Sequence, residues 1–279
     1  MEPKSKVLVV DDDRALNHVL VELLRQAGFT ASSATDGAAA LKSIEGENFD
    51  IVLLDIGLPR MSGLDVLQRI QGMKSPPLVL VMTADETPAT VLGAVKGQAY
   101  RYLSKPLKPK SVVDLVEEMA RAPQPAAIEV ISAKPDWVEL IVPCRIEMAN
   151  RLNSFLQVLN TQLPEEIRDS VEVAFRELFV NAVEWGGHFD PARTVRIACI
   201  RSQRMLIYRI QDPGSGFQPE KLAHAAINNH PDEPYAHIKV REELSLRPGG
   251  FGLMMTRAMV DELIYNEAHN EVVFVKYLD

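Results

Sequence analysis

Cysteine is scarce in this sequence, with two residues among 279. Cys144 and Cys199 have no second ligand at metal-site spacing and no pairing pattern typical of a secreted scaffold, so neither a zinc site nor a disulfide framework is indicated. No stretch approaches the roughly 18 apolar residues that a membrane helix needs, and the apolar run 7–10 is too short for a signal-peptide core. We therefore expect a cytoplasmic protein without a membrane segment.

A surplus of positive charge is also absent. The chain has 30 Lys and Arg residues against 38 Asp and Glu residues, which gives a formal net charge of −8. A protein that binds nucleic acid normally concentrates Lys and Arg on one face to neutralise phosphates, and the sequence contains no such cluster. The composition argues against a nucleic-acid partner and favours a protein partner or a small ligand.

The length and the apolar pattern indicate two domains. In the first, short β-branched runs alternate with segments of helical period, which is typical of βαβ units around a parallel sheet. The predicted strands are 7–10, 30–34, 51–54, 78–82 and 100–103, and the predicted helices are 14–27, 37–46, 63–71, 88–96 and 109–120. We expect an α/β, flavodoxin-like, doubly wound (βα)5 domain over residues 1–121.

Residues 122–127, APQPAA, form a Pro-rich connector that we expect to be stiff and extended. The pattern after the connector differs, because strands and helices are now segregated. The predicted strands are 128–132, 137–142, 194–200, 205–211 and 271–277, and the predicted helices are 145–160, 164–185 and 252–263. This order predicts an α+β two-layer sandwich over residues 128–279.

Acidic residues follow two of the predicted strands of the first domain. Asp11 and Asp12 come directly after the first strand, and Asp55 ends the third. The carboxyl ends of parallel strands converge on one crevice, where several carboxylates repel one another unless a divalent cation lies among them. Thr83 and Lys105 follow the fourth and fifth strands and can meet phosphate oxygens. The sequence therefore predicts a Mg²⁺ and phosphoryl site.

The stretches VLVVDDD, IVLLDIGLP, TA at 83–84 and YLSKP closely resemble the bacterial response-regulator receiver family over residues 6–120. The resemblance implies that Asp55 accepts a phosphoryl group from an upstream histidine kinase. It also implies that Asp11 and Asp12 hold Mg²⁺ together with Asp55 and a carbonyl oxygen of Gly57.

The same resemblance implies a two-residue switch. Thr83 and Tyr102 match the family positions at which a hydroxyl swings toward the aspartyl phosphate and an aromatic ring follows it inward. Lys105 matches the cation that meets the phosphate.

A second group of polar residues belongs to the second domain. Glu177 and Asn181 are four residues apart, so they share one face of the predicted helix 164–185, a face that is otherwise apolar. The glycine-rich turns 212–217 and 248–253 follow later, and glycine allows the backbone to approach a ligand closely. The second turn opens a helix, whose free amides favour phosphate, and Asp212 can accept a hydrogen bond from an adenine amino group.

The stretches ELFVNAVEWGG, DPGSG and GGFGLMMTRAMVDE resemble the GHKL (Bergerat-fold) ATPases over residues 128–279, and within them the anti-sigma-factor serine/threonine kinases. The resemblance implies bound ATP, with Mg²⁺ coordinated by Asn181 and with Glu177 as the general base. It implies that Asp212 holds adenine. The glycines that would shape the pocket and the hinges of its lid are Gly214, Gly216, Gly250 and Gly252.

Two features set this second domain apart. Trp185 and Gly187 stand where the family usually carries His and Asn. The long segment 218–247 between the glycine turns resembles a lid, and we expect its histidines to be solvated loop residues rather than metal ligands. These histidines are His224, His230 and His237, and the segment also contains Arg241 and Arg247.

The resulting hypothesis is a response regulator whose output is an ATP-dependent Ser/Thr protein kinase in a partner-switching pathway. Its expected partners are a histidine kinase and a small anti-anti-sigma-like protein or sigma factor; a homodimer is left open. One alternative is a non-catalytic nucleotide-binding module that sequesters a protein. A hybrid histidine kinase is less favoured, because no dimerising hairpin with a phosphoacceptor His precedes residue 128. The sequence does not give the sign of control by phosphorylation.

Overall fold

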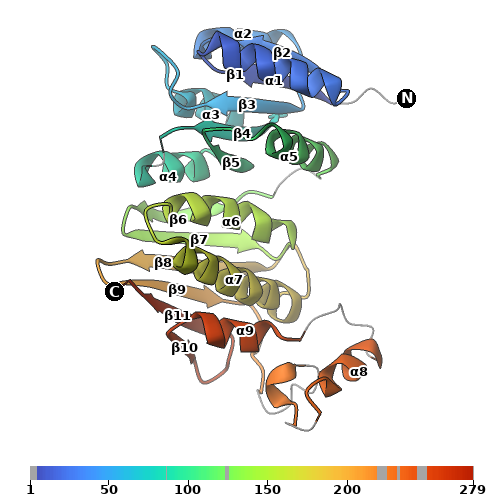
Figure 1. Cartoon of the computed structure of the whole chain (residues 1–279), viewed down its shortest axis with the longest axis vertical. Helices are drawn as coiled ribbons and strands as arrows, with labels where there is room; N and C mark the ends of the chain where they lie inside the picture. The colour runs from blue at the N-terminus through green and yellow to red at the C-terminus, as the bar shows by residue number, and fades with distance from the viewer. Residues whose placement is uncertain are drawn as a thin grey trace. The chain divides into compact units, whose positions relative to one another are not determined.

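Figure 1 shows the computed structural model of the chain, which describes residues 5–85, 87–122, 126–218, 225–230, 233–243 and 250–278. The chain divides into two compact units, Met1–Ala127 and Ile128–Asp279. Residues 123–125 of the connector, together with His224 and Arg247 of the lid segment, lie outside the described residues.

The first unit is built on a five-stranded parallel sheet with the order β2-β1-β3-β4-β5. Its strands are β1 (Lys6–Val10), β2 (Thr30–Ala34), β3 (Ile51–Asp55), β4 (Leu78–Thr83) and β5 (Arg101–Ser104). Its helices are α1 (Arg14–Gln26), α2 (Gly37–Gly46), α3 (Gly63–Gln71), α4 (Pro88–Lys96) and α5 (Pro109–Arg121). This is the flavodoxin-like doubly wound fold that the sequence predicts.

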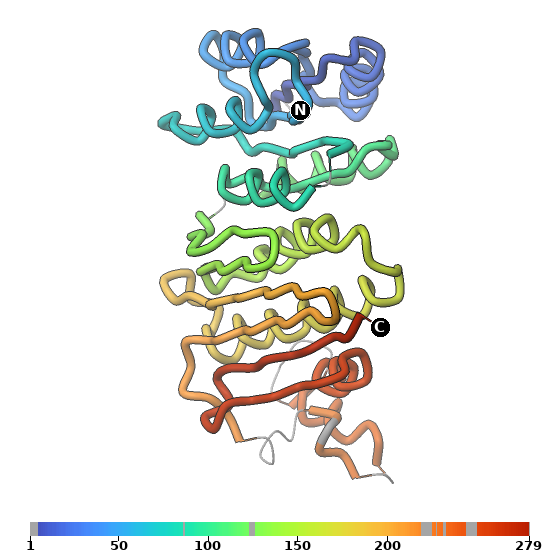
Figure 2. The backbone as a smooth tube through the Cα atoms, turned by 90° about the vertical axis from the view of Figure 1, so that its left-hand side faces the viewer, coloured from blue at the N-terminus to red at the C-terminus, as the bar shows by residue number. Residues whose placement is uncertain are grey.

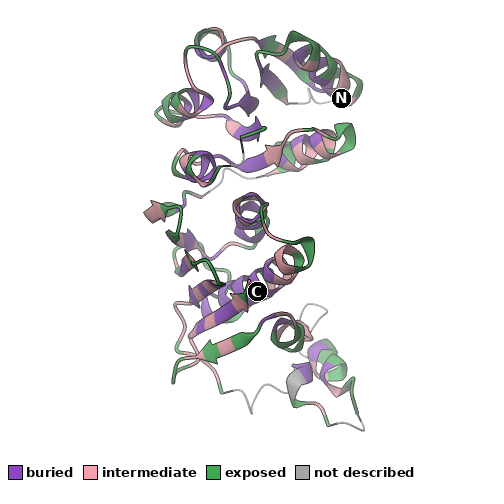
Figure 3. Ribbon diagram, turned by 60° about the vertical axis from the view of Figure 1, so that its left-hand side comes forward, coloured by how far each residue is buried: buried purple, intermediate pink, exposed green. Residues whose placement is uncertain are grey.

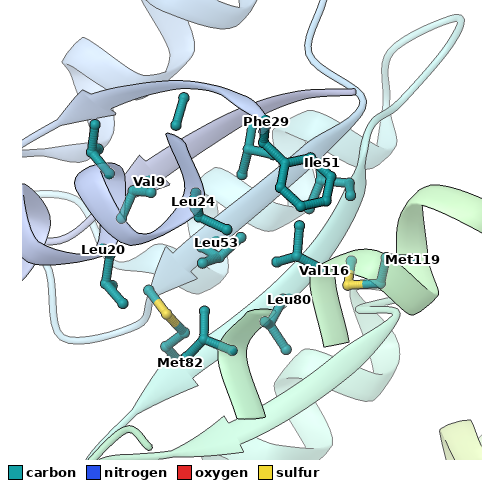
Figure 4. Close-up of a cluster of buried hydrophobic side chains, with 14 of the residues drawn as sticks. Val9, Leu20, Leu24, Phe29, Ile51, Leu53, Leu80, Met82, Val116 and Met119 are labelled. Atoms are coloured by element: carbon teal, nitrogen blue, oxygen red, sulfur yellow. The ribbon is translucent and has the colours of Figure 1, made fainter. Parts of the chain in front are cut away.

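The central strands of this sheet are buried on both faces. Leu53 of β3 and Leu80 of β4 are fully buried and pack with Leu24 of α1 and Val116 of α5, as Figure 4 shows. Burying a side chain of this size stabilises the fold by about 1.5–3 kcal/mol. Figure 3, which is coloured by burial, shows the same arrangement. The strands are mainly purple (buried), whereas the helices are purple on one side and green (exposed) on the other.

The second unit is built on a six-stranded antiparallel sheet with the order β10-β11-β9-β8-β7-β6, and Figure 2 traces these strands back and forth. Its strands are β6 (Glu129–Lys134), β7 (Trp137–Pro143), β8 (Thr194–Arg201), β9 (Met205–Gln211), β10 (Glu262–Tyr265) and β11 (Glu271–Tyr277). Its longer helices are α6 (Glu147–Leu159), α7 (Glu165–Asn181), α8 (Ala236–Glu243) and α9 (Gly252–Met259). Helices α6, α7 and α9 lie over one face of the sheet, which gives the predicted two-layer α+β sandwich (Figure 1).

Two predicted elements of the second unit need correction. The helix predicted over 252–263 ends at Met259, because Val260 is extended and residues 262–265 pair with β11 as strand β10. The helix predicted to reach residue 185 ends at Asn181 and continues as a π-helix, Ala182–Gly186, in which Gly187 N–H donates to the Ala182 carbonyl. The segment predicted as a lid contains a helix, α8, and a short 3₁₀ turn, Ala226–Asn228.

Among the described residues, no helix combines the length and the apolar character that crossing a bilayer requires.

Candidate functional site

The carboxyl ends of β1 and β3 place three carboxylates in one pocket of the first unit. Asp11 and Asp55 are buried, whereas Asp12 is exposed. Oxygen atoms of these three side chains all lie within 4.8 Å of one another. Hard carboxylate oxygens at this spacing fit a Mg²⁺ ion, which also accepts phosphate oxygens as ligands. The structure therefore brings together the acidic residues of the predicted metal site.

Lys105 lies just after β5 and bridges two of these carboxylates. Its Nζ donates to Asp11 Oδ2 and to Asp55 Oδ2, both at 2.7 Å. Burial raises the pKa of Asp11, while the hydrogen bond from Lys105 opposes this shift. Burial alone would lower the pKa of Lys105, but its hydrogen bonds to the two aspartates outweigh burial, and its pKa is raised. A protonated lysine thus neutralises part of the pocket's negative charge.

Gly57 lies in the turn that follows β3. Its N–H donates to Asp55 Oδ1 at 3.1 Å, so the turn orients the Asp55 side chain. The sequence prediction concerns the carbonyl oxygen of Gly57 as a metal ligand, and that role stays a prediction. Gly57 is nevertheless close to the pocket, because a Cβ added to it would lie 3.7 Å from both Asp55 carboxylate oxygens.

The two predicted switch residues meet at Asp85 in the turn before α4. Asp85 N–H donates to Thr83 Oγ1 at 3.0 Å, and the buried Tyr102 donates its hydroxyl to the Asp85 carbonyl at 2.8 Å. The Asp85 side chain accepts hydrogen bonds from Thr90 Oγ1 at 2.6 Å and from Thr87 N–H at 3.0 Å, and these bonds lower its pKa. Asp85 therefore links Thr83 to Tyr102 and to the first turn of α4 through hydrogen bonds.

The second unit contains a cavity of about 890 Å³. A cavity of this size suits a nucleotide-sized ligand. All seven residues predicted to bind ATP line it, and these are Glu177, Asn181, Asp212, Gly214, Gly216, Gly250 and Gly252. They come from α7, from the turn after β9 and from the start of α9. The fold therefore brings residues that are up to 75 positions apart in the sequence to the same cavity.

Asp212 forms the centre of the first glycine turn. Its Oδ1 accepts a hydrogen bond from Gly214 N–H at 2.7 Å, and Asn270 Nδ2 donates to the Gly214 carbonyl at 3.0 Å. A methyl group on Gly186 or on Gly214 would overlap the Asp212 carboxylate, so both glycines permit its position. Burial raises the pKa of Asp212, and the bond from Gly214 and the charge of Arg193 oppose this shift.

Glu177 and the second glycine turn lie against each other. A Cβ built on Gly252 would overlap Glu177 Oε2, so a larger residue at this position would displace the carboxylate. Helix α9 begins without a side-chain cap at Phe251. Gly252 and Leu253 line the cavity, so the uncapped first turn of α9 faces a potential ligand. Free amides and the positive end of a helix dipole favour phosphate.

Several cavity residues were not predicted from the sequence. Arg193 Nη2 donates to the Pro213 carbonyl at 2.7 Å and lines the cavity. Phe217, Tyr265 and His269 form an aromatic cluster at the cavity wall, with ring centroids 5.2–5.7 Å apart. Two of these aromatic rings belong to β10 and the turn after it, and no strand was predicted there.

The prediction for the lid segment is wrong at one histidine. His230 is exposed as expected, but His237 is fully buried on α8. The structural reason is that Asn229 hydrogen-bonds both the backbone and the ring of His237, whose ring also packs against Phe251. Arg241 of the same helix is also buried and lines the cavity.

Comparisons with known proteins agree with the two units. Residues 7–117 match the family model of the response regulator receiver domain, and residues 143–276 match that of the histidine kinase-like ATPase domain. The chain belongs to the response-regulator family, and its receiver domain is followed by a histidine kinase-like ATPase domain of the GHKL type.

The relatives of the chain include mycobacterial regulators. The DNA-binding response regulator MtrA of Mycolicibacterium paratuberculosis is 32% identical over 211 residues, which cover 75% of this chain and 91% of MtrA. The sensory transduction protein RegX3 of Mycobacterium bovis is 37% identical over 117 residues, which cover 42% of this chain and 51% of RegX3. A CheY-like receiver domain from Methanospirillum hungatei covers 42% of this chain and 93% of its own, with 25% identity and a TM-score of 0.41.

Proposed function

We propose that this response regulator controls an ATP-dependent Ser/Thr protein kinase, its own second domain, through phosphorylation of Asp55. The observation that carries the proposal is the convergence of Glu177, Asn181, Asp212 and the glycine turns on one cavity in a chain that begins with a receiver. An ATPase domain implies ATP binding, so the finer question is where the phosphoryl group goes.

In the first step, an oxygen of Asp55 attacks the phosphorus of a phosphohistidine on an upstream kinase, and the histidine nitrogen leaves. Lys105 is 2.7 Å from Asp55 and can follow the phosphate oxygens with its ammonium group. Mg²⁺ bound by Asp11, Asp12, Asp55 and the Gly57 carbonyl would neutralise the developing charge. The Thr83 hydroxyl would then turn toward the phosphate and alter its bond with Asp85.

In the second step, Glu177 acts on a hydroxyl of the partner. The carboxylate accepts the proton of a Ser or Thr side chain as the oxygen attacks the terminal phosphorus of ATP, and ADP leaves. Asn181 lies one turn further along α7, on the same face, and would hold Mg²⁺ next to the phosphates. The proximity of Glu177 to Gly252 at the start of α9 supports this role, because the free amides of a helix N-terminus favour phosphate.

Asp212 would select adenine by accepting a hydrogen bond from its exocyclic amino group. The carboxylate is held by Gly214 and is part of the cavity wall, which supports this role. GTP carries an acceptor at the corresponding position, so we expect it to bind far more weakly than ATP.

The partner would be a small anti-anti-sigma-like protein or a sigma factor, by analogy with the family that the second domain resembles. MtrA is named a DNA-binding regulator. We do not expect nucleic acid as a partner of this chain, because its residues 143–276 match an ATPase model.

A single-turnover experiment tests the proposal. Labelled ATP, Mg²⁺ and a candidate small partner protein are mixed with the full chain, with its Glu177→Gln variant or with its Asn181→Ala variant. We expect phosphoserine or phosphothreonine on the partner with the wild type only. For Asn181→Ala, we expect ATP affinity to lose its Mg²⁺-dependent part in calorimetry.

Trp185 favours one alternative, a nucleotide-binding module that sequesters a partner without phosphorylating it. This side chain is 39% exposed and lines the cavity where the kinase family usually has His. If the wild type binds ATP and retains the partner but transfers no label, and Glu177→Gln behaves in the same way, the binding module is the correct function.

A further inference from the structure

The antiparallel sheet of the second unit has one face under helices α6, α7 and α9 and an outer face on its other side (Figure 1). Tyr208 of β9 is fully buried, and its ring centroid lies 5.9 Å from that of Phe175 of α7, so Tyr208 marks the helical face. Neighbouring residues of a strand point to opposite faces. Trp137 and Ile200 accordingly belong to the outer face, where they are 45% and 43% exposed.

Six residues, one from each strand, form a continuous row across the outer face, which we call the sheet row. The pairing register places them side by side in strand order, and they are Lys134, Trp137, Ile200, Ile207, Val275 and Glu262. The four central residues are apolar, and the two charged residues at the ends are exposed. Ile264 of β10, which is 53% exposed, lies on the same face two residues from Glu262. An apolar centre with a charged rim is typical of a protein interface.

Charged residues beside the sheet row are paired within the chain. Arg196 Nε lies 2.7 Å from Glu139 Oε1, and Arg209 Nη2 donates to Glu271 Oε2 at 2.6 Å. Covering a charged side chain is most costly when it leaves the charge without a partner. These two ion pairs therefore allow a second protein to cover the face.

The outer face is large enough for a stable association. With strands about 4.8 Å apart, the sheet row is about 24 Å long, and seven-residue strands such as β9 and β11 also reach about 24 Å. Two such faces packed together would bury about 1,100 Å² in total, compared with the roughly 1,000 Å² expected of a biological interface.

The opposite charges at the ends of the sheet row favour a second copy of this chain as the occupant. A two-fold axis parallel to the strands, between two facing sheets, reverses the row of the second copy. Lys134 then meets Glu262 of the partner subunit at both ends, and the apolar centres meet each other. An axis along the row would instead bring like charges together, which is unfavourable. Packed sheets are rotated by about 30°, an offset that long Lys and Glu side chains can span.

We propose that the second domain forms a homodimer through the outer face of its sheet, with the two sheet rows running in opposite directions. The inference goes beyond the proposed kinase activity and does not depend on it. Ile210 and Val272 line the nucleotide cavity from the helical face of the sheet, so each copy keeps its cavity on the side away from the dimer interface.

Sedimentation equilibrium of the full chain over a range of protein concentrations tests this inference. We expect reversible dimers of the wild type. Ile200→Glu places a charge in the apolar centre twice per dimer, and the dissociation constant should rise by about 100-fold or more. The matched control is Ile238→Glu on α8, where the isoleucine is 38% exposed, and it should dimerise like the wild type.

Charge exchange tests the direction of the rows. Lys134→Glu and Glu262→Lys each bring like charges together at both ends of the interface, and each should raise the dissociation constant by about tenfold. An equimolar mixture of these two variants should form a heterodimer about as stable as the wild-type dimer, because opposite charges then meet at both ends.

Three results would overturn the inference. A wild type that stays monomeric at every concentration would show that the outer face does not bind a second copy. Equal dimerisation of Ile200→Glu and the wild type would place the dimer interface elsewhere in the chain. A mixture of the two charge variants that associates no better than either variant alone would show that the rows do not run in opposite directions.

Discussion

The acidic pocket of the receiver and the cavity of the ATPase domain differ in how their functional groups are held. In the receiver, Lys105 and the turn after β3 already fix the carboxylates of Asp11 and Asp55 through hydrogen bonds of 2.7–3.1 Å. In the ATPase domain, side chains from α7, α8, α9 and two turns surround about 890 Å³. The first site is suited to a small ion and one phosphoryl group, and the second to a large ligand that touches several elements.

Asp55→Asn should have the largest effect, because it removes the only proposed phosphoryl acceptor of the receiver. We expect complete loss of labelling by acetyl phosphate in the presence of Mg²⁺, with normal labelling of the control Asp114→Asn on the exposed side of α5. Base-labile phosphate that persists on Asp55→Asn would show that another residue accepts the phosphoryl group.

Lys105→Met should test how strongly the receiver pocket depends on its internal cation. Without Mg²⁺, this variant leaves Asp11 and Asp55 close together and buried, and we expect a loss of about 3 kcal/mol in the free energy of unfolding. Because Lys105 occupies carboxylate oxygens that a metal would use, Mg²⁺ should raise the melting temperature of the variant more than that of the wild type.

The control for this comparison is Lys110→Met. Its ion pair with Asp114 is on the surface, and its removal should not change stability measurably. An equal response of the wild type and Lys105→Met to Mg²⁺ in thermal unfolding would contradict the shared use of the carboxylates.

Gly252→Ala should show that the ATPase cavity depends on close backbone packing. Alanine is the better helix former, so helix propensity alone predicts a small gain in stability. The added methyl group would instead overlap Glu177 Oε2, and we expect ATP affinity to fall by about tenfold, or roughly 1.4 kcal/mol. Gly46→Ala is the matched control, because its Cβ would have no neighbour within 4 Å. Unchanged ATP affinity in Gly252→Ala would show that Glu177 is not part of the nucleotide site.

Asp212→Asn should have the smallest effect and a pH dependence of known sign. Burial raises the pKa of Asp212 above 3.8, so its ionised form destabilises the folded state at neutral pH, and this cost disappears as the pH falls through the raised pKa. The melting temperature of Asp212→Asn relative to the wild type should therefore be higher at pH 7 than at pH 4. The opposite trend in thermal unfolding would mean that neighbouring groups stabilise the carboxylate.

The fold and the site of the receiver can largely be predicted from the sequence. The functional residues follow buried strands rich in β-branched residues, and a parallel sheet brings the carboxyl ends of such strands to one edge. The structure accordingly gathers Asp11, Asp12, Asp55 and Lys105 in one pocket. The role of Asp85 was not predictable, because it acts through its own backbone N–H and carbonyl groups, which every residue possesses.

The ATPase domain can be predicted from the sequence only in part. The glycine turns and the pair Glu177 and Asn181 reveal the cavity, but strand β10 does not have a distinctive pattern of its own and forms because β11 is available to pair with it. The burial of His237 and Arg241 on α8 was not predictable from the local sequence, because it accompanies tertiary contacts such as the packing of His237 against Phe251. Such tertiary contacts override local propensity.

We propose that the state of Asp55 controls phosphoryl transfer in the second domain. The rate of label transfer from ATP to the partner protein, measured with the full chain before and after treatment with acetyl phosphate, tests this control. We predict that the rate changes by about 5- to 150-fold, which corresponds to a coupling of 1–3 kcal/mol, and that Asp55→Asn shows no change. Identical rates before and after phosphorylation of the wild type would show that Asp55 does not control the second domain.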